Sequence, residues 1–426
     1  MKRLALILGS LSVAACGQPL LSSPPIVART VEEQVNPVQV QGDGALFQRL
    51  ADFGETNGAI PFAGLVDVGG TFYGTTTLGG NSGCFSYQTL AGCGVVYKVT
   101  PSGRQAAIYS FRGSPDGSFP FAGLTTVGGT LYGITTKGGN SSCGSSSSPS
   151  GCGTVFKITS SGSETVLHSF AGGNDGQDPP WAPLVAVKGV LFGVTQNGGT
   201  RGGGTLFKIT TAGKESVLYS FKENSAESHP EGIAYIDGEF FATTEGDGGP
   251  YSHDYGSLVK LTSSGKASIL YTFKSFPDGA FPKGPIVSVG DVLYGATVAG
   301  GANQCGSVGC GTVFAITMSG KEHVIHSFNF KKHDGVTPYS GLMAKNGSLY
   351  GTACCGGPSN GGIVFKLTTS GKETILHAFT SYGKDGDAPY GGLVAAGGLL
   401  YGTTGYGGKT KGHFKYGYGT VFSVRP

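Results

Sequence analysis

The chain has 426 residues, of which 78 are glycine and only 13% are charged. β-Branched and aromatic residues alternate with glycine-rich turns and no segment repeats apolar residues at helical spacing, which excludes a helical bundle and predicts an all-β fold. The formal net charge of +3 gives no electrostatic support for a nucleic-acid partner. Because the length exceeds that of an ordinary domain, internal repeats are the first feature to seek.

The N-terminus has the layout of an export leader. Lys2 and Arg3 precede a short apolar run, and small residues then lead to Cys16. This segment resembles the lipobox of bacterial lipoproteins, and the resemblance implies a signal peptide over residues 1–15 and lipidation of Cys16. An ordinary signal peptide with an incidental cysteine is the alternative. Gly17 in place of aspartate favours an outer-membrane lipoprotein or cell-surface location in the bacterial envelope.

Residues 16–45 contain several prolines and few aromatic residues, a composition typical of an extended tether. No later apolar run approaches the length of about 20 residues that a membrane-spanning helix needs. We therefore expect the protein to contact the membrane only through its lipid anchor.

Three sequence motifs recur after the tether. The first, typified by Tyr-Gly-Thr-Thr, begins at Tyr73, Tyr132, Phe192, Phe241, Tyr294, Tyr350 and Tyr401. The second, typified by Gly-Thr-Val-Phe-Lys-Ile, begins at Gly94, Gly153, Gly204, Gly256, Gly311, Gly362 and Gly419. The third ends at Phe111, Phe170, Phe221, Phe273, Phe328 and Phe379, and a proline opens each unit at Pro61, Pro120, Pro180, Pro230, Pro282, Pro338 and Pro389. Each unit thus offers four short strands, here called a to d, which is typical of a propeller blade.

The last unit lacks its fourth strand, and residues 46–53 supply a matching sequence ahead of the first unit. We therefore predict that this N-terminal strand completes the last blade and leaves no open sheet edge. The predicted fold is an all-β, seven-bladed β-propeller of four-stranded antiparallel blades over residues 46–426. The predicted blades span residues 61–111, 120–170, 180–221, 230–273, 282–328, 338–379 and 389–426 with 46–53.

The connections between strands b and c vary in length, whereas those between c and d do not. In an antiparallel meander the b–c and d–a loops leave the sheet at the same end. Varied loops on a rigid repeated scaffold are where binding or catalysis usually takes place. This loop face is therefore the predicted functional face.

The repeated Tyr-Gly-Thr-Thr-x-x-Gly-Gly, Gly-Thr-Val-Phe-Lys-Ile and Ser-Phe motifs resemble those of the GloVer tandem-repeat family of bacterial envelope proteins. The resemblance extends over roughly residues 46–426. It implies a repeat fold and an exported location, and it assigns no activity and no catalytic residue.

Three cysteine pairs fall in the b–c loops: Cys84 with Cys93, Cys143 with Cys152, and Cys305 with Cys310. An oxidising envelope and the repeated placement predict local disulfides, with a zinc site as the alternative that the spacing disfavours. The adjacent Cys354 and Cys355 form either a vicinal disulfide or two free thiols.

Asp-Gly pairs recur in the d–a loops at Asp116, Asp175, Asp278, Asp334 and Asp385, and Asn57-Gly58 replaces them in the first unit. We interpret them as turn formers, with a ring of carboxylates around a cation as the alternative. Histidine replaces the tyrosine of strand d at His168, His326 and His377, and we interpret these as packing residues.

Residues that break the repeat are better candidates for a site, because the scaffold does not require them. The candidate ligand-binding residues, mostly from blades four and seven, are Trp181, Arg201, His229, Asp247, His253, Lys409, His413 and Tyr416. We identify no cofactor and no metal, and a structural cation stays an open alternative. With no recognised catalytic motif, the leading hypothesis is a monomeric binding module whose loop face takes a glycan, a peptide or an envelope protein.

The alternative is a carbohydrate-active enzyme, a polysaccharide lyase or glycosidase. Its catalytic residues would be His253, His413, Tyr251 and Glu245. Because one fold can host many functions, the fold alone does not distinguish the two hypotheses. The enzyme hypothesis requires His253 and His413 to meet in one pocket with a carboxylate or with Arg201.

Overall fold

The computed structural model describes residues 47–80, 83–84, 86–87, 90–140, 143, 150–247, 254–303, 305, 308–410, 414 and 416–426. The signal peptide, the tether and Cys16 lie outside these ranges, so export and lipidation stay predictions. No helix in the described part of the chain is both long enough and apolar enough to cross a membrane.

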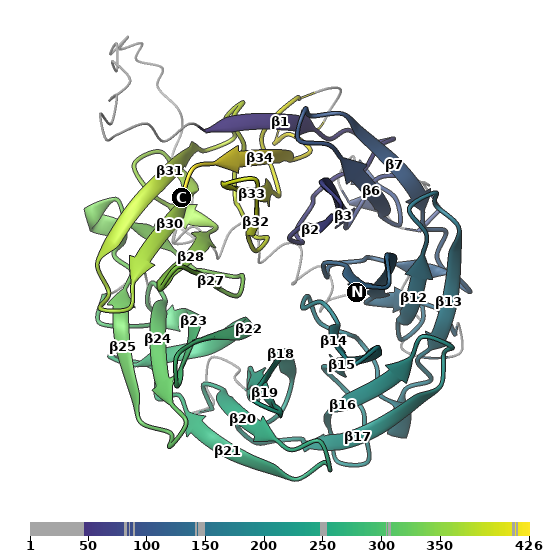
Figure 1. Cartoon of the computed structure of the whole chain (residues 1–426), viewed down its shortest axis with the longest axis horizontal. Helices are drawn as coiled ribbons and strands as arrows, with labels where there is room; N and C mark the ends of the chain where they lie inside the picture. Colours follow the sequence, from purple (N-terminus) through teal and green to yellow (C-terminus); the bar gives the residue numbers. More distant parts are fainter. Residues whose placement is uncertain are drawn as a thin grey trace, which may run out of the picture.

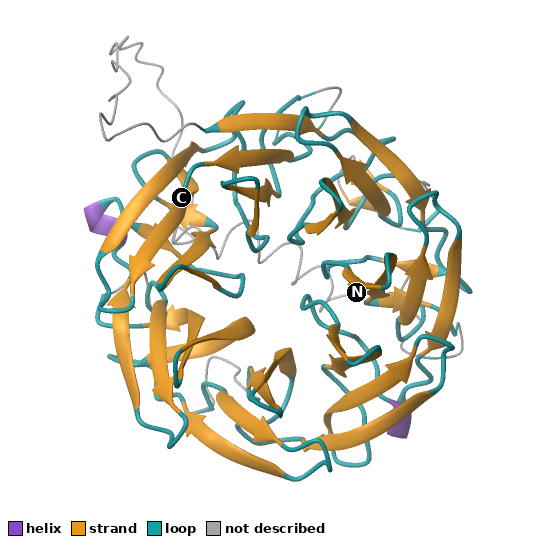
Figure 2. Ribbon diagram, viewed as in Figure 1, coloured by secondary structure: helices purple, strands orange, loops and turns teal. Residues whose placement is uncertain are grey.

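Seven four-stranded antiparallel sheets stand around a central axis, with the first strand of each innermost and the last outermost (Figures 1 and 2). This arrangement confirms the predicted seven-bladed β-propeller. The first blade runs outward through β2 (Val66–Val68), β3 (Thr71–Thr76), β6 (Val95–Val99) and β7 (Gln105–Ser110). The second runs through β9 (Thr125–Val127), β10 (Thr130–Thr135), β12 (Thr154–Ile158) and β13 (Glu164–Ser169). The third runs through β14 (Val185–Val187), β15 (Val190–Thr195), β16 (Gly202–Thr210) and β17 (Glu215–Lys222).

The remaining blades repeat this plan. The fourth contains β18 (Pro230–Ile236), β19 (Glu239–Thr244), β20 (Ser257–Leu261) and β21 (Ala267–Thr272). The fifth contains β22 (Gly279–Val289), β23 (Val292–Gly300), β24 (Thr312–Thr317) and β25 (Glu322–Ser327). The sixth contains β27 (Met343–Lys345), β28 (Ser348–Ala353), β30 (Asn360–Thr368) and β31 (Glu373–Thr380), and the seventh contains β32 (Val394–Ala396), β33 (Leu399–Thr404), β34 (Thr420–Val424) and β1 (Gln48–Asp52). The loops hold β4 (Ser86–Tyr87), β5 (Leu90–Ala91), β8 (Gly117–Ser118), β11 (Lys137–Gly138), β26 (Gly335–Val336), β29 (Cys355–Gly356) and the 3-10 turns η1 (Gly173–Asp175) and η2 (Phe330–Lys332).

The N-terminal strand closes the ring as predicted. β1 pairs antiparallel with β34, with Gln48 opposite Ser423 and Asp52 opposite Thr420. The last described residues of the chain therefore lie beside the first (Figure 1). This pairing covers the edge that β34 would otherwise expose.

Aromatic rings connect each blade to the next. At six of the seven junctions the phenylalanine that ends strand d packs against the aromatic residue of strand c in the following blade, as Phe111 does edge-on against Phe156 with ring centroids 5.1 Å apart. The same contact joins Phe170 to Phe207 and Phe379 to Phe422, each at 5.2 Å. This geometry is favourable for aromatic pairs, and it explains why the Ser-Phe and Val-Phe motifs recur together.

The glycine of the Tyr-Gly-Thr-Thr motif makes room for the ring of strand c. Gly351 lies opposite Phe365, and a Cβ at Gly351 would lie 2.6 Å from the tip of that ring. In the fourth blade alanine takes the place of glycine, and the facing residue is the smaller Val259 opposite Ala242. The two positions therefore vary together within this one chain, as close packing requires.

We expect Gly351→Ala to destabilise the protein by about 1–3 kcal/mol, because the added methyl overpacks a fully buried ring. Chemical denaturation monitored by circular dichroism measures this change. The matched control is Ala242→Gly, which removes a methyl at the equivalent position facing valine and should cost only about 0.5–1 kcal/mol. Equal losses in the two variants would contradict the packing explanation.

Candidate functional site

A cavity of about 540 Å³ lies on the central axis, where side chains from most of the blades converge. The residue that follows the blade-opening proline contributes to its wall in six blades: Phe62, Trp181, Glu231, Lys283, Tyr339 and Tyr390. These residues stand at the inner end of the d–a loop, so the repeat itself directs them to the axis. These six positions thus give the wall four aromatic rings and two charged side chains from neighbouring blades.

Trp181 is the centre of the aromatic part. Its ring stacks on Phe121 at 4.8 Å and on Phe62 at 5.4 Å between centroids, and it reaches Tyr339 at 5.9 Å. Trp181 belongs to the third blade and Tyr339 to the sixth, so the cluster extends across the axis. Tyr390 packs edge-on against Phe62 at 4.6 Å.

The opposite part of the wall is charged. The Nζ of Lys283 lies 2.8 Å from Glu231 Oε1 and 3.1 Å from Glu245 Oε2. The side-chain amide of Gln196 donates to Glu231 Oε1 at 2.7 Å. Glu231 is only 5% exposed, and a buried carboxylate is tolerated because these donors compensate it.

Two extended strands hold these charges in place. β18 begins at Pro230 and β22 at Gly279, whereas the innermost strands of the other five blades have three residues each and begin further from the proline. Lys283 therefore stands inside the β22–β23 ladder, opposite Ala296. Glu245 directly follows β19, at the position that Gln196 occupies after β15 in the third blade.

The two carboxyl groups have different proton affinities. Burial raises the pKa of Glu231 to about 7, although Lys283 acts in the opposite direction. Burial also disfavours the charged form of Glu245, but the attraction of Lys283 outweighs it and lowers the pKa of this group. The two glutamates raise the pKa of Lys283 above its usual range. Near neutral pH the cavity therefore holds one fixed ion pair and one carboxyl close to its titration point.

His229 extends the polar wall toward the loops. Its Nδ1 lies 3.1 Å from the carbonyl oxygen of Gly246 and 3.6 Å from Asp247 Oδ1. Asp247 also accepts a hydrogen bond of 2.8 Å from the Ser228 hydroxyl. This set orients the imidazole at the rim of the cavity.

The structure brings only some of the predicted site residues together. Trp181, His229 and Glu245 line the central cavity, and Asp247 contacts His229. Arg201 lies at another place, where it donates to Glu227 at 2.9 Å and to Tyr219 at 2.9 Å.

The predicted residues of the seventh blade lie apart from this cavity. Lys409 Nζ is 3.6 Å from Asp52 Oδ2 and borders a separate cavity of about 390 Å³ beside the closure. Tyr416 packs on Tyr382, with centroids 4.9 Å apart. Tyr251, His253 and His413 lie outside the described residues, so the required meeting of the two histidines stays untested.

Sequence reasoning missed Glu231 and Lys283. The signal was present, because the residue after the opening proline is aromatic in five units and charged only in the fourth and fifth. A position-by-position comparison of the seven units would have found it.

The three predicted disulfides are confirmed: Cys84–Cys93, Cys143–Cys152 and Cys305–Cys310. Each joins the ends of a b–c loop segment. Cys354 and Cys355 are buried, and their Sγ atoms lie 3.0 Å apart as thiols in contact.

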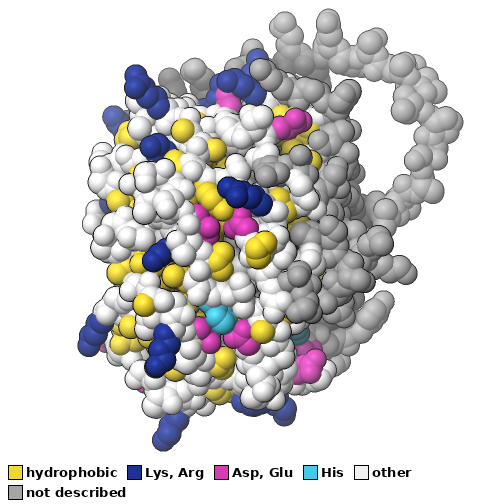
Figure 3. Space-filling model, turned by 90° about the vertical axis from the view of Figure 1, so that its right-hand side faces the viewer, with side chains coloured by type: hydrophobic (Ala, Val, Ile, Leu, Met, Phe, Trp, Pro, Cys, Tyr) yellow, Lys and Arg dark blue, Asp and Glu magenta, His cyan; other side chains and the backbone are white. Residues whose placement is uncertain are grey.

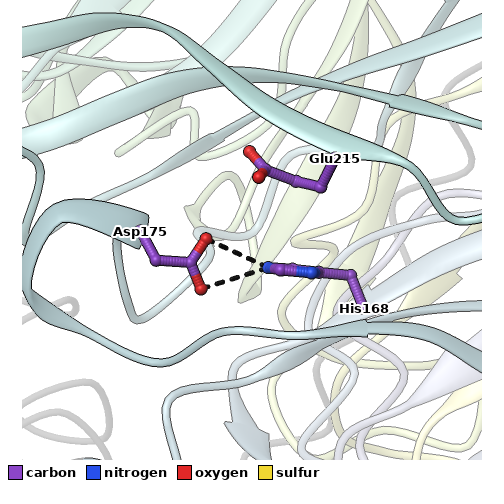
Figure 4. A group of neighbouring side chains, drawn as sticks. All are labelled: His168, Asp175 and Glu215. Carbon is purple, nitrogen blue, oxygen red and sulfur yellow. Dashed lines mark hydrogen bonds and ion pairs between the residues drawn. The ribbon is translucent and has the colours of Figure 1, made fainter.

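Two side-chain clusters at blade junctions bring together residue types that can bind a metal ion. His168, Asp175 and Glu215 form one (Figure 4), and His326, Asp334 and Glu373 form the other, with the nearest oxygen and nitrogen atoms within 4.8 Å of one another. Tyrosine replaces the histidine at two equivalent junctions, where Tyr109 and Tyr271 still bond the loop aspartate at 2.8 Å. The arrangement therefore forms without a metal-binding histidine.

Comparison with solved structures gives distant similarities. The designed protein Ika8 is 12% identical with a TM-score of 0.46, covering 88% of this chain and 99% of that chain. The gluconolactonase XC5397 from Xanthomonas campestris is 15% identical with a TM-score of 0.37, covering 64% and 78%. The PQQ-bound aldose sugar dehydrogenase from Streptomyces coelicolor is 11% identical with a TM-score of 0.44, covering 90% and 98%. Similarities this distant identify neither a ligand nor a reaction.

Among curated proteins, none matches this sequence. A family profile described as the Gloeobacter/Verrucomicrobia repeat matches residues 144–309 and 302–426, which together make up more than half of the chain. The recurring motifs that define the seven blades led us to expect this family. The chain belongs to the Gloeobacter/Verrucomicrobia repeat family.

Proposed function

We propose that the protein is a binding module whose central cavity takes a neutral sugar unit of a glycan. The observation that supports this proposal most is the meeting of aromatic rings with the Glu231–Lys283–Glu245 group in one cavity. The cavity volume of about 540 Å³ is in the range of small-molecule sites, about 300–1,000 Å³.

Sugar chemistry fits both parts of this wall. The apolar faces of a sugar pack on aromatic rings, here Trp181, Tyr339 and Tyr390, which line the cavity. Hydroxyl groups both donate and accept, and Glu231, Lys283 and Gln196 offer acceptors and donors at fixed positions. An anionic ligand is disfavoured, because two carboxyl groups share a single ammonium group.

Trp181 is the only tryptophan of the chain, so its fluorescence reports directly on the cavity. We expect neutral oligosaccharides from a glycan array to change this emission in a saturable way. Trp181→Ala should weaken binding measured by calorimetry by about two- to twelvefold, because an aromatic contact is worth about 0.5–1.5 kcal/mol beyond its buried area.

Arg201→Ala and Tyr416→Ala are the matched controls, because both residues lie on the loops away from the central cavity. They should leave sugar affinity unchanged. Binding that depends on Arg201 or Tyr416 and ignores Trp181 would instead favour a peptide or envelope protein bound on the loop face, and the cavity proposal would fail.

A glycosidase is the second candidate, and the separated proton affinities of two neighbouring carboxyl groups favour it. Glu231 would act as the acid, and the ionised Glu245 beside it would stabilise the positive charge that forms on the sugar ring. The two carboxyl groups are too close to hold a water between them as an acid and a base do. Each sugar that binds should therefore be incubated and its products examined by mass spectrometry. Cleavage that Glu231→Gln and Glu245→Gln abolish while binding persists would establish this candidate.

A further inference from the structure

The outer rim of the ring repeats one side-chain arrangement at the junctions between blades. A glutamate that begins the outer strand of one blade meets the loop aspartate of the blade before it. Four junctions have this pair: Asp116 with Glu164, Asp175 with Glu215, Asp278 with Glu322, and Asp334 with Glu373. In Figure 3 acidic side chains lie in small groups on the side wall, one of them beside a histidine. Two carboxyl groups therefore face each other wherever such a glutamate occurs.

Each aspartate is fully engaged. Asp116 accepts from the Tyr109 hydroxyl at 2.8 Å and from the backbone amides of Arg112 and Gly117 at 3.0 and 2.7 Å. At the histidine junctions Asp175 faces His168 Nε2 at 3.1 Å, and the carboxyl group of Glu215 lies near the same ring nitrogen (Figure 4). The aspartates are thus held as hydrogen-bond acceptors.

Each glutamate, in contrast, has a carboxyl oxygen without a hydrogen-bond partner among the described residues. Within the described part of the chain, the Oε1 atoms of Glu164, Glu215, Glu322 and Glu373 are buried and have no hydrogen-bond donor. An ionised carboxylate can only accept, and an unsatisfied buried acceptor is costly. A protonated carboxyl would instead donate to the acceptors around it.

The closing junction contains the uncharged counterpart of this pair. Asn57 replaces the loop aspartate and Gln105 replaces the glutamate. The Nδ2 of Asn57 donates to Gln105 Oε1 at 2.6 Å, and Gln105 Nε2 donates to the Asn57 carbonyl oxygen at 3.1 Å. Each amide has both a donor and an acceptor, so this junction supplies the donors that two ionised carboxyl groups would lack.

The two remaining junctions avoid a facing pair of carboxyl groups. At the junction of the third and fourth blades the loop carboxyl group is that of Glu227, which forms an ion pair of 2.9 Å with Arg201. Ala267 stands there at the start of the outer strand, where four other junctions have a glutamate. At the junction of the sixth and seventh blades the loop residue is Asp385, and Phe47 takes the place of the glutamate. The Phe47 ring stacks on His377, with centroids 3.6 Å apart. At both junctions an uncharged residue therefore stands where the glutamate would be, so two ionised carboxyl groups do not meet there.

We propose that Glu164 and Glu322 hold a proton in the folded ring and donate it across the blade junction, so that these two junctions weaken together when this proton is lost. The proton moves between the glutamate and solvent, and no other reactant is needed. Tyrosine stands at both junctions in place of histidine, which separates this arrangement from a metal site.

The direction of the titration agrees with the geometry. Burial raises the pKa of Glu164 and Glu322 to about 7, and the neighbouring Asp116 and Asp278 act in the same direction. The other groups that face these glutamates act in the opposite direction: Tyr109 and Arg112 beside Glu164, and Tyr271 and Lys274 beside Glu322. Because the folded state holds the proton more tightly than the unfolded chain, this stabilisation is complete below about pH 4.5 and is lost as the pH rises through about 7.

The test uses the two tyrosine junctions, where no histidine titrates. E164Q/E322Q places a permanent amide donor at both glutamates. We expect this variant and the wild type to unfold at the same temperature at pH 5, and the variant to unfold roughly 2–4 °C higher at pH 8.5. The matched control N57D/Q105E installs an acid pair at the closing junction and should lower the unfolding temperature only as the pH rises. Parallel curves for the wild type and E164Q/E322Q across this range would overturn the proposal.

A direct measurement reads the proton itself. With carboxyl-labelled glutamate, the NMR signals that disappear in E164Q and E322Q should titrate near neutral pH, and titration at the usual glutamate pH would overturn the proposal.

Discussion

Replacing Lys283 by methionine is expected to destabilise the protein by about 3–5 kcal/mol, because it leaves the buried Glu231 without its cation and beside the partly exposed Glu245. The loss should be greater at pH 8 than at pH 5. Without the ammonium group the pKa of both carboxyl groups rises in the folded state, so the variant gains stability as the pH falls and the carboxyl groups take up protons. Denaturant titrations at the two pH values measure the difference. Sugar binding should be lost at the same time.

Two further variants identify the cause. Adding Glu231→Gln and Glu245→Gln to the methionine variant removes the unpaired charges and should recover most of the stability at pH 8. Lys260→Met is the surface control, because Lys260 pairs with Glu239 at 2.5 Å where both side chains are about a third exposed, and such pairs contribute little. A loss in the Lys260 variant as large as that at Lys283 would show that burial is not the cause.

Removing the chain up to Phe53 is expected to open the ring. The deletion takes away β1 and the ring of Phe53, which is 2% exposed and packs on Tyr97 at 4.7 Å. Loss of the buried phenylalanine side chain alone should cost about 3–5 kcal/mol. The exposed edge of β34 should also make the variant self-associate, which sedimentation measures.

The missing strand can be supplied separately. A synthetic peptide of residues 47–54 should add to β34, restore the monomer and raise the unfolding temperature in a concentration-dependent way. A peptide of the same composition in scrambled order is the control. A truncated protein that stays monomeric and unfolds like the full chain would show that β1 does not close the ring.

Much of the fold could be predicted because its determinants are local and repeated. Each blade carries its own turns and its own Gly-aromatic pair, as Gly351 with Phe365 illustrates. The closure followed from one missing strand, and the disulfides followed from pairs such as Cys84 and Cys93 within one loop. Each of these inferences needs only a comparison of one unit with the next.

The charged group of the central cavity could not be predicted in the same way. Comparing the units marks Glu231 and Lys283 as unusual, but it does not show that side chains from two blades touch each other. Glu231, Lys283 and Glu245 meet only where two lengthened inner strands reach the axis. The prediction that residues of the fourth and seventh blades form one site relied only on the unusual composition of their loops. Composition does not show that the Lys409 side chain points toward Asp52 at the closure. The direction of a loop side chain depends on where its blade stands around the axis.

The pairing of β1 with β34 also dictates when folding can end. β1 has no partner in its own blade until β34 has been made. During synthesis, the growing chain therefore carries β1 unpaired until the seventh blade appears. Bringing the two together from a disordered chain would cost on the order of 5 kcal/mol in loop-closure entropy. That cost falls once the six other blades have formed and have carried the ends toward each other. Closure is therefore expected as the slowest step, after the blades themselves.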